Sequence, residues 1–320
     1  MKKFLISIDT EGDNFWEWSP GDPIKTDNAK YVQRFQELCN KFGYRPTYLI
    51  NYEMACDEDF VSYIKKELEL NRCEVGMHLH AWNSPPLYEL EIRDNIKPGE
   101  CSYLIEYPTE IMKKKIFYIS NFIEKKFGVR PIVHRAGRWA TNQLYFELLD
   151  EAGYIADCSV TPGMNMTNAL GFTNIGKGSD YTKFPKTTYN IKNTSLLEIP
   201  MTVRSNHRIK KDNNTGIKHK LYNLYKAVKR RGTVWLRPNG SNLDDLIYLV
   251  DKIIKENSSD YLMFMLHTSE MMPGGSPTFR TKESIEKLYS DLEVLFEYIS
   301  KHFKGETIGE YAQEKMRKKN

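Results

Sequence analysis

The chain has 320 residues, 40% of them hydrophobic and 28% charged, with a formal net charge of +4 at pH 7. This length supports one large α/β domain or two smaller ones, and the composition excludes extended disorder and collagen-like repeats. Five cysteines without a Cys-x-x-Cys pair predict neither a disulfide framework nor a cysteine zinc site.

The first apolar run, residues 4–8, is followed at once by Asp9, Glu11 and Asp13. It therefore predicts a buried strand and not the hydrophobic region of a signal peptide. No apolar run in the sequence is long enough to cross a bilayer. We expect a cytoplasmic protein.

Strand-like and helix-like segments alternate from this first strand onward. Short apolar runs predict strands at residues 4–8, 47–50, 74–79, 132–134, 154–156, 196–199, 233–236 and 261–266. Helical spacing of apolar residues predicts helices at residues 28–42, 58–70, 109–127, 142–152, 218–229, 243–255 and 282–303. Continuous apolar strands between amphipathic helices are typical of a parallel sheet, and the length and strand count favour a closed barrel over an open, doubly wound sheet. We expect one such domain over residues 1–320.

Two kinds of connection bear on function. Residues 9–13 contain three acids where a dinucleotide-binding fold needs glycines, so a Rossmann domain is not expected. The irregular segments 84–107 and 161–194 are too long for simple connections, and we interpret them as loops that cover a substrate.

Unusual polar residues gather at the carboxyl ends of the predicted strands. In chain order they are Asp9, Glu11, His78, His80, Arg135, Asp157, Glu198, Arg237 and His267. In a parallel α/β barrel these strand ends form one rim, where such folds build their active sites. Each residue alone has a structural explanation, such as helix capping or core packing, but their shared position predicts an active site.

Two pairs in this set have i, i+2 spacing, which directs both side chains to one side of an extended segment. His78 and His80 could bind a metal ion together, although a His-x-His pair also occurs by chance. In the pair Asp9 and Glu11, one carboxylate could bind the metal while the other acts as a base. The alternative is that Asp9 or Asp13 caps a turn.

These residues resemble the motifs of the NodB-type polysaccharide deacetylases, which are metal-dependent carbohydrate esterases. Five motifs are similar in order, at residues 7–12, 74–80, 134–139, 153–157 and 266–267. The resemblance implies the fold of that family, a distorted seven- or eight-stranded (β/α) barrel.

Three departures distinguish the chain from the common family pattern. Thr10 separates the two acids, and the second acid is Glu11 rather than an aspartate. Trp82 stands four residues after His78, where the family usually has its second histidine, so His80 takes that role. The proline that follows the family's arginine is absent. These departures indicate a divergent branch.

The resemblance also implies a role for each site residue. The implied metal ligands are Glu11, His78 and His80, and the implied catalytic residues are Asp9, Arg135 and His267. Asp9 would be the base, oriented by Arg135, and His267 the general acid, with Zn²⁺ as the expected ion. The implied reaction removes the N-acetyl group of an N-acetylated sugar, free or carrier-linked, in surface polysaccharide synthesis. Two alternatives stay open: a related metal amidase acting on a small non-sugar amide, and a carbohydrate-binding relative without catalysis.

Aromatic and basic residues predict further contacts. Trp82, Trp139 and Trp235 lie beside the motifs, and we expect one of them to stack on a sugar while the others belong to the core. Residues 204–231 contain ten Lys or Arg and one acid, Asp212. We interpret this segment as a solvated face, the alternative being contact with an anionic membrane surface or a pyrophosphate-linked substrate. No nucleic-acid partner is expected.

Overall fold

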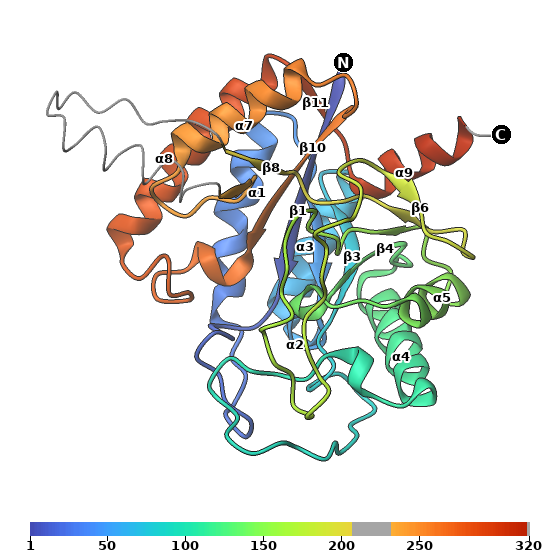
Figure 1. Ribbon diagram of the computed structural model, residues 1–320. Coiled ribbons are helices and arrows are strands. Elements are labelled where there is room, and N and C mark those ends of the chain that lie inside the picture. Colours follow the sequence, from blue (N-terminus) through green and yellow to red (C-terminus); the bar gives the residue numbers. More distant parts are fainter. Residues whose placement is uncertain (207–231, 319–320) are drawn as a thin grey trace, which may run out of the picture.

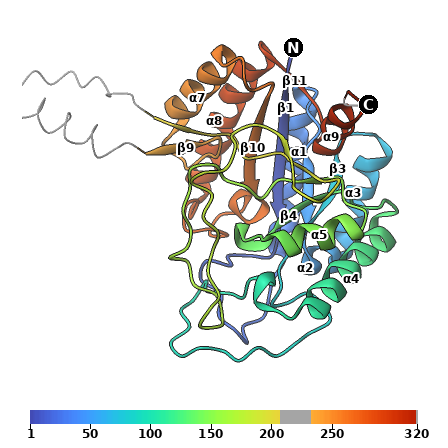
Figure 2. The same ribbon diagram turned by 45° about the vertical axis from the view of Figure 1, so that its right-hand side comes forward.

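The computed structural model of the protein describes residues 1–206 and 232–318 (Figure 1). A curled sheet stands at its centre, with helices along its outer side (Figure 2). The predicted helix at 218–229 and most of the basic segment 204–231 lie outside the described residues.

Strands, α-helices and short 3₁₀ helices are interspersed along the chain. The strands are β1 (Lys2–Thr10), β2 (Thr47–Ile50), β3 (Glu74–Leu79), β4 (Val133–Ala136), β5 (Ala156–Asp157), β6 (Tyr189–Asn190), β7 (Leu197–Glu198), β8 (Val203–Ser205), β9 (Thr233–Trp235), β10 (Tyr261–His267) and β11 (Phe303–Gly305). The α-helices are α1 (Val32–Lys41), α2 (Tyr52–Cys56), α3 (Glu58–Glu69), α4 (Thr109–Phe127), α5 (Gln143–Glu151), α7 (Leu243–Lys255), α8 (Lys282–Ser300) and α9 (Ile308–Arg317). Short 3₁₀ helices are η1 (Asp27–Tyr31), η2 (Leu104–Glu106), η3 (Gly137–Trp139) and η4 (Thr268–Met271).

The main sheet has the strand order β10-β1-β2-β3-β4-β5-β7-β6, and β11 pairs with β1. Neighbouring strands are parallel except for β6 and β7. Between β7 and β10, two single hydrogen bonds take the place of a regular strand pairing. Leu236, just after β9, donates its N–H to Thr202 O at 3.0 Å, and Met265 of β10 donates its N–H to Leu236 O at 3.1 Å. The sheet therefore forms a distorted barrel, and the predicted α/β fold class is confirmed.

One predicted strand takes a different place. The segment predicted at 233–236 forms β9, which pairs antiparallel with β8 in a separate two-stranded sheet. Its apolar run resembles that of a buried strand, but an apolar run does not specify a pairing partner. The sequence interpretation also missed α2, β6, β8, β11 and α9, which the structure adds.

Alternation along β1 separates two cores. Phe4, Ile6 and Ile8 face outward and pack with apolar residues of the surrounding helices. Leu5 faces inward and packs in a smaller core with Met263 of β10. The inward positions after Leu5 are polar, so the barrel interior changes from apolar to polar toward the carboxyl ends of the strands.

The two ends of the barrel differ accordingly. At the apolar end, α9 contributes Ile308, Tyr311 and Ala312 to the inner core and lies near the start of β1 (Figure 1). At the opposite end, the long loops that follow β1 and β3 gather in the lower part of the same view. This arrangement leaves the polar end for a functional site.

The helix boundaries follow local signals. The Asp57 side chain accepts the Phe60 N–H at the start of α3, and the Asn142 side chain accepts the Tyr145 N–H at the start of α5. α4 ends before Gly128, whose φ of 76° is a conformation that favours glycine. Among the described residues, no helix combines the length and the hydropathy that a membrane span requires.

Candidate active site

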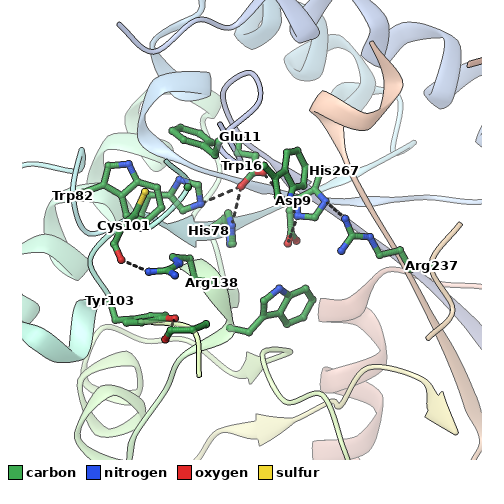
Figure 3. A pocket seen from close by; sticks show the side chains of 15 residues that line it. Asp9, Glu11, Trp16, His78, Trp82, Cys101, Tyr103, Arg138, Arg237 and His267 are labelled. Atoms are coloured by element: carbon green, nitrogen blue, oxygen red, sulfur yellow. Dashed lines mark hydrogen bonds and ion pairs between the residues drawn. The ribbon is translucent and has the colours of Figure 1, made fainter. Parts of the chain in front are cut away.

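A pocket opens at the carboxyl ends of β1, β3 and β10 (Figure 3). Of the polar residues that the sequence places at strand ends, those lining the pocket are Asp9, Glu11, His78, His80, Arg237 and His267. These residues come from segments far apart in the chain. Those of β1, β3 and β10 meet because the parallel strands end at the same rim, and Arg237 reaches the pocket from the segment after β9.

Glu11, His78 and His80 form a compact buried cluster. Glu11 Oε2 lies 3.1 Å from His80 Nε2 and 3.5 Å from His78 Nε2. One ligand atom from each of the three residues lies within 4.8 Å of the others. One carboxylate and two imidazoles are a donor set that suits Zn²⁺ and leaves further coordination positions open.

The orientation of each histidine is set by its second ring nitrogen. His78 Nδ1 lies 3.0 Å from the Arg135 carbonyl oxygen, which accepts a hydrogen bond from Nδ1–H, so that Nε2 faces Glu11. His80 Nδ1 faces Asn51 Nδ2 at 3.3 Å and Glu53 Oε1 at 3.8 Å. Both rings therefore direct Nε2 to the same point.

Burial and charge act against each other in this cluster. Burial opposes ionisation of Glu11, but the nearby His267 and hydrogen bonds from the two histidines hold its pKa below the usual range. Burial lowers the pKa of His80 to about 4. Burial also disfavours the charged form of His78, yet Asp9 and Glu11 raise its pKa. At neutral pH the cluster thus offers a carboxylate and at least one neutral imidazole.

Asp9 is anchored through one of its two oxygens. The fully buried Arg135 donates from Nη1 to Asp9 Oδ1 at 2.5 Å, and from Nη2 to Ser7 Oγ at 2.8 Å. Burial would raise the pKa of Asp9, but Arg135, His78 and His267 together lower it and keep the carboxyl ionised. The second oxygen, Oδ2, is buried with no partner among the described residues and lies 3.7 Å from His267 Nε2. A buried carboxylate oxygen is thus free to accept a proton inside the pocket.

His267 is held by a residue that the sequence interpretation missed. The His267 Nδ1–H donates to Glu270 Oε2 at 2.8 Å, which turns Nε2 toward Asp9 and Glu11. Arg237 Nη2 donates to Glu270 Oε1 at 2.9 Å. Burial opposes ionisation of Glu270, but Arg237 and His267 lower its pKa to about 2. The sequence does contain a signal for Glu270, because it is an acid three residues after the histidine that ends β10.

Asp157 and Glu198 do not belong to the pocket, which corrects the prediction that they lie on its rim. Their neighbours Ala156, Cys158 and Leu197 face the inner core, so both acids point to the opposite side of the sheet. There the His134 Nδ1–H donates to Asp157 Oδ2 at 2.6 Å. Burial and Asp157 raise the pKa of Glu198 well above its usual value. These groups form a buried polar network behind the site.

The two predicted loops do cover the pocket. Tyr103 of segment 84–107 and Ala169 of segment 161–194 both line it, and the Tyr103 hydroxyl donates to Ala169 O at 2.9 Å. Of the three tryptophans singled out in the sequence, Trp82 and Trp139 line the pocket. Trp235 packs edge-on against Trp139, with ring centroids 5.6 Å apart, and lines an adjoining cavity.

Comparison with known proteins identifies the fold. No protein-family model matches the sequence, and the curated proteins include no relative similar in sequence. Among solved structures, a protein assigned as a polysaccharide deacetylase from Mycobacterium smegmatis is 13% identical, with a TM-score of 0.55, over 99% of this chain and 92% of that one. The chain has the fold of a polysaccharide deacetylase.

The same fold occurs in enzymes that carry out other reactions. A 4-α-glucanotransferase from Thermococcus litoralis is 13% identical with a TM-score of 0.55, over 98% of this chain and 40% of that one. A GH57 branching enzyme from Thermococcus kodakaraensis is 12% identical with a TM-score of 0.51, over 98% of this chain and 71% of that one. The deacetylase fold alone therefore leaves the reaction open, and the site residues must supply the argument.

Proposed function

We propose that this chain is a metal-dependent deacetylase that hydrolyses the N-acetyl group of an N-acetylated sugar. The observation that carries the proposal is Asp9, a buried carboxylate with one oxygen anchored by Arg135 and the other unpartnered beside His267. The Glu11, His78 and His80 cluster lies in the same pocket. The deacetylase fold supports the same reaction class.

Glu11, His78 and His80 would hold a divalent ion, for which Zn²⁺ suits the mixed carboxylate and imidazole donors. When bound, such an ion polarises the acetyl carbonyl and makes water more acidic. The orientation of both imidazoles by their Nδ1 atoms fits this use of their Nε2 atoms.

The remaining steps belong to the side chains. Asp9 Oδ2 takes the proton of the attacking water, while Arg135 keeps Asp9 ionised and fixed in place. His267 Nε2 then protonates the leaving nitrogen, since amines leave poorly without a proton. This step uses the imidazolium form, whose Nε2–H supplies the proton, and Glu270 fixes the ring by accepting the hydrogen bond from Nδ1–H.

The aromatic walls of the pocket favour a sugar over a small aliphatic amide. Trp139 and Tyr103 line the pocket with flat faces of the kind on which sugar rings stack. Three statements stay predictions. They are that the sugar is either free or carrier-linked, that the protein is cytoplasmic, and that residues 1–320 form one domain. Contact of the segment 204–231 with an anionic membrane also stays a prediction, because most of that segment is outside the described residues.

Metal analysis combined with acetate release tests the proposal. The purified protein should contain about one metal ion per chain, and it should release acetate from one or more of free, nucleotide-linked and lipid-linked N-acetyl sugars. A chelator should abolish release, and Zn²⁺ should restore it. His80→Ala and Glu11→Ala should lose the ion, whereas His302→Ala, at an exposed histidine outside the pocket, should keep it.

Other outcomes would select the alternatives. A chain that contains no stoichiometric metal and hydrolyses no acetylated sugar, yet binds one, would be a carbohydrate-binding relative. A chain that hydrolyses only small non-sugar amides would be an amidase. Retention of the ion by His80→Ala would remove His80 from the ligand set.

A further inference from the structure

Arg138 is a cation of the pocket without a counter-charge. It follows β4 in η3, lines the pocket and is partly buried. Its guanidinium donates to two backbone carbonyls, Cys101 O and Leu170 O, and stacks 4.3 Å from the centre of the Tyr103 ring. These bonds occupy two of the five N–H groups that an arginine offers, and neither bond neutralises its charge.

This absence of a counter-charge is unusual within the molecule. Among the arginines in the described residues, every one except Arg138 and Arg317 has a carboxylate within ion-pair distance. Arg317 is exposed to solvent, which screens its charge. Arg237, the other arginine that lines the pocket, is neutralised by Glu270. Arg138 is therefore the partly buried arginine whose charge no described carboxylate balances.

The backbone holds Arg138 in place at a cost. Arg138 and Trp139 have φ values of 54° and 62°, a left-handed conformation that residues other than glycine seldom adopt. Such strain persists only where the surroundings enforce it, and it is concentrated at functional sites. In this conformation the Arg138 guanidinium lies over the Tyr103 ring in the pocket, as Figure 3 shows.

We propose that Arg138 binds an anionic group of the substrate, a carboxylate or a phosphate on the acetylated sugar. The substrate class would then be an acidic or phosphorylated N-acetyl sugar rather than a neutral one. The planar guanidinium pairs with both kinds of anion, and a partly desolvated site strengthens that pairing. This assignment rests on the proposed deacetylase function, which it makes more specific.

Binding measurements test the proposal independently of catalysis. Trp82 and Trp139 line the pocket, so tryptophan fluorescence can follow sugar binding directly. The probes are N-acetylglucosamine, N-acetylglucosamine 1-phosphate and N-acetylmuramic acid, which are neutral, phosphorylated and carboxylated. At least one anionic sugar should bind the wild-type protein roughly 10- to 100-fold more tightly than the neutral one, the worth of one charge-assisted hydrogen bond.

Three variants assign this preference to Arg138. Arg138→Gln should abolish the preference while leaving the affinity for the neutral sugar nearly unchanged, and Arg138→Lys should keep part of it. Arg317→Gln makes the same charge change at an exposed arginine of α9 and should have no effect. The phosphate and carboxylate arms show which anion the site prefers.

The contrary results are distinct. If Arg138→Gln keeps the anion preference, the anion binds elsewhere, for example at the metal cluster. If Arg138→Gln lowers the affinity for all three sugars equally, Arg138 only ties the loops together. Equal wild-type affinities for all three sugars would overturn the anion proposal and leave acetate release as the test of deacetylation. An anion preference without any acetate release would overturn deacetylation instead.

Discussion

Arg135 engages Asp9 through a single oxygen, which leaves a buried carboxylate oxygen without a hydrogen bond from any described residue. Such an unpaired group costs about 1–3 kcal/mol of stability. A cost of this kind is common where strain or incomplete pairing serves a reaction. Asp9 is accordingly the residue whose replacement separates chemistry from metal binding most cleanly.

Asp9→Asn should leave the metal content unchanged and lower the rate of acetate release by about 10²–10⁴-fold, the usual contribution of an acid–base group. Metal analysis and acetate release on the same preparation measure both effects. Ser7→Ala is the matched control, because it removes another hydrogen bond of Arg135 and leaves the carboxylate intact. A wild-type rate in Asp9→Asn, or an equal loss in Ser7→Ala, would show that Asp9 is not the base.

If His267 protonates the leaving group, its loss should slow the hydrolysis of substrates with a poor leaving group most. His267→Ala should lower acetamide hydrolysis by about 10²–10⁴-fold but affect an activated ester such as p-nitrophenyl acetate far less. Glu270→Gln should act in the same direction with a smaller effect, since it only positions the ring. The ratio of amide to ester rates is the measurement. Equal losses on both substrates would argue for a purely structural histidine.

At the scale of elements, the two covering loops are fastened to each other by Glu106. Its carboxylate accepts the Thr173 N–H at 2.7 Å, the Thr173 hydroxyl at 2.8 Å and the Tyr103 N–H at 2.5 Å. The carboxylate also packs against Gly171 and Gly176, where a Cβ atom would clash with it. Glu106 therefore helps to hold segment 161–194 in position over the pocket, alongside the bonds of Tyr103 to Ala169 O and of Arg138 to Leu170 O.

Glu106→Ala should loosen this cover without changing the reacting groups. We expect KM to rise about tenfold while kcat stays within about threefold, because the variant loses substrate positioning rather than chemistry. Hydrogen exchange of residues 169–176 should become faster. Glu110→Ala, at an exposed acid on α4, is the control. Unchanged KM and unchanged exchange would show that other contacts hold the loop.

The buried acids behind the site connect β4, β5 and β7 and predict a pH dependence of stability. The pKa of Glu198 is raised, so above about pH 4.5 the folded state keeps a proton that the unfolded chain releases. The contribution of Glu198 to the free energy of unfolding is therefore largest in acid and declines as the pH rises toward its folded-state pKa.

Glu198→Gln mimics the protonated acid and should remove this decline. The stability of the variant relative to the wild type should increase between pH 5 and pH 8, as measured by urea unfolding. Asp157→Ala serves as the contrast, because it leaves His134 and Ser159 without an acceptor and should cost about 3 kcal/mol at both pH values. A Glu198→Gln difference that does not vary with pH would indicate an ionised Glu198.

At the scale of the whole molecule, the sequence was informative where patterns were long. Helical periodicity located α4 and α8, and the resemblance to the deacetylases indicated the fold that the structure confirms. α9 was missed although Thr307 and Glu310 form a capping box at its start. Its short amphipathic pattern follows β11 closely, and nothing local shows that it covers one end of a barrel.

The placement of side chains depended on strand length. On β1, the outward Phe4, Ile6 and Ile8 fix the alternation, so Asp9 could be placed inward with Glu11. β5 and β7 contain two residues each and have apolar neighbours, so their alternation could not be determined from the sequence. Asp157 and Glu198 were therefore placed on the wrong side. The grouping of the rim residues came from topology, whereas Glu270 and Arg138 depend on tertiary contacts that no local pattern encodes.

The covered end of the barrel gives a last prediction, which separates stability from function. Tyr311 of α9 is buried in the inner core, and its hydroxyl donates to Asp260 Oδ1 at 2.8 Å. Tyr311→Ala should lower the free energy of unfolding by about 3–5 kcal/mol, as for other large buried aromatic residues. The pocket is at the opposite end, so kcat and KM measured well below the melting temperature should be unchanged. Gln313→Ala, at an exposed position of the same helix, should change neither quantity. A loss of activity in folded Tyr311→Ala would mean that α9 acts on the site through the barrel and does more than cover its apolar end.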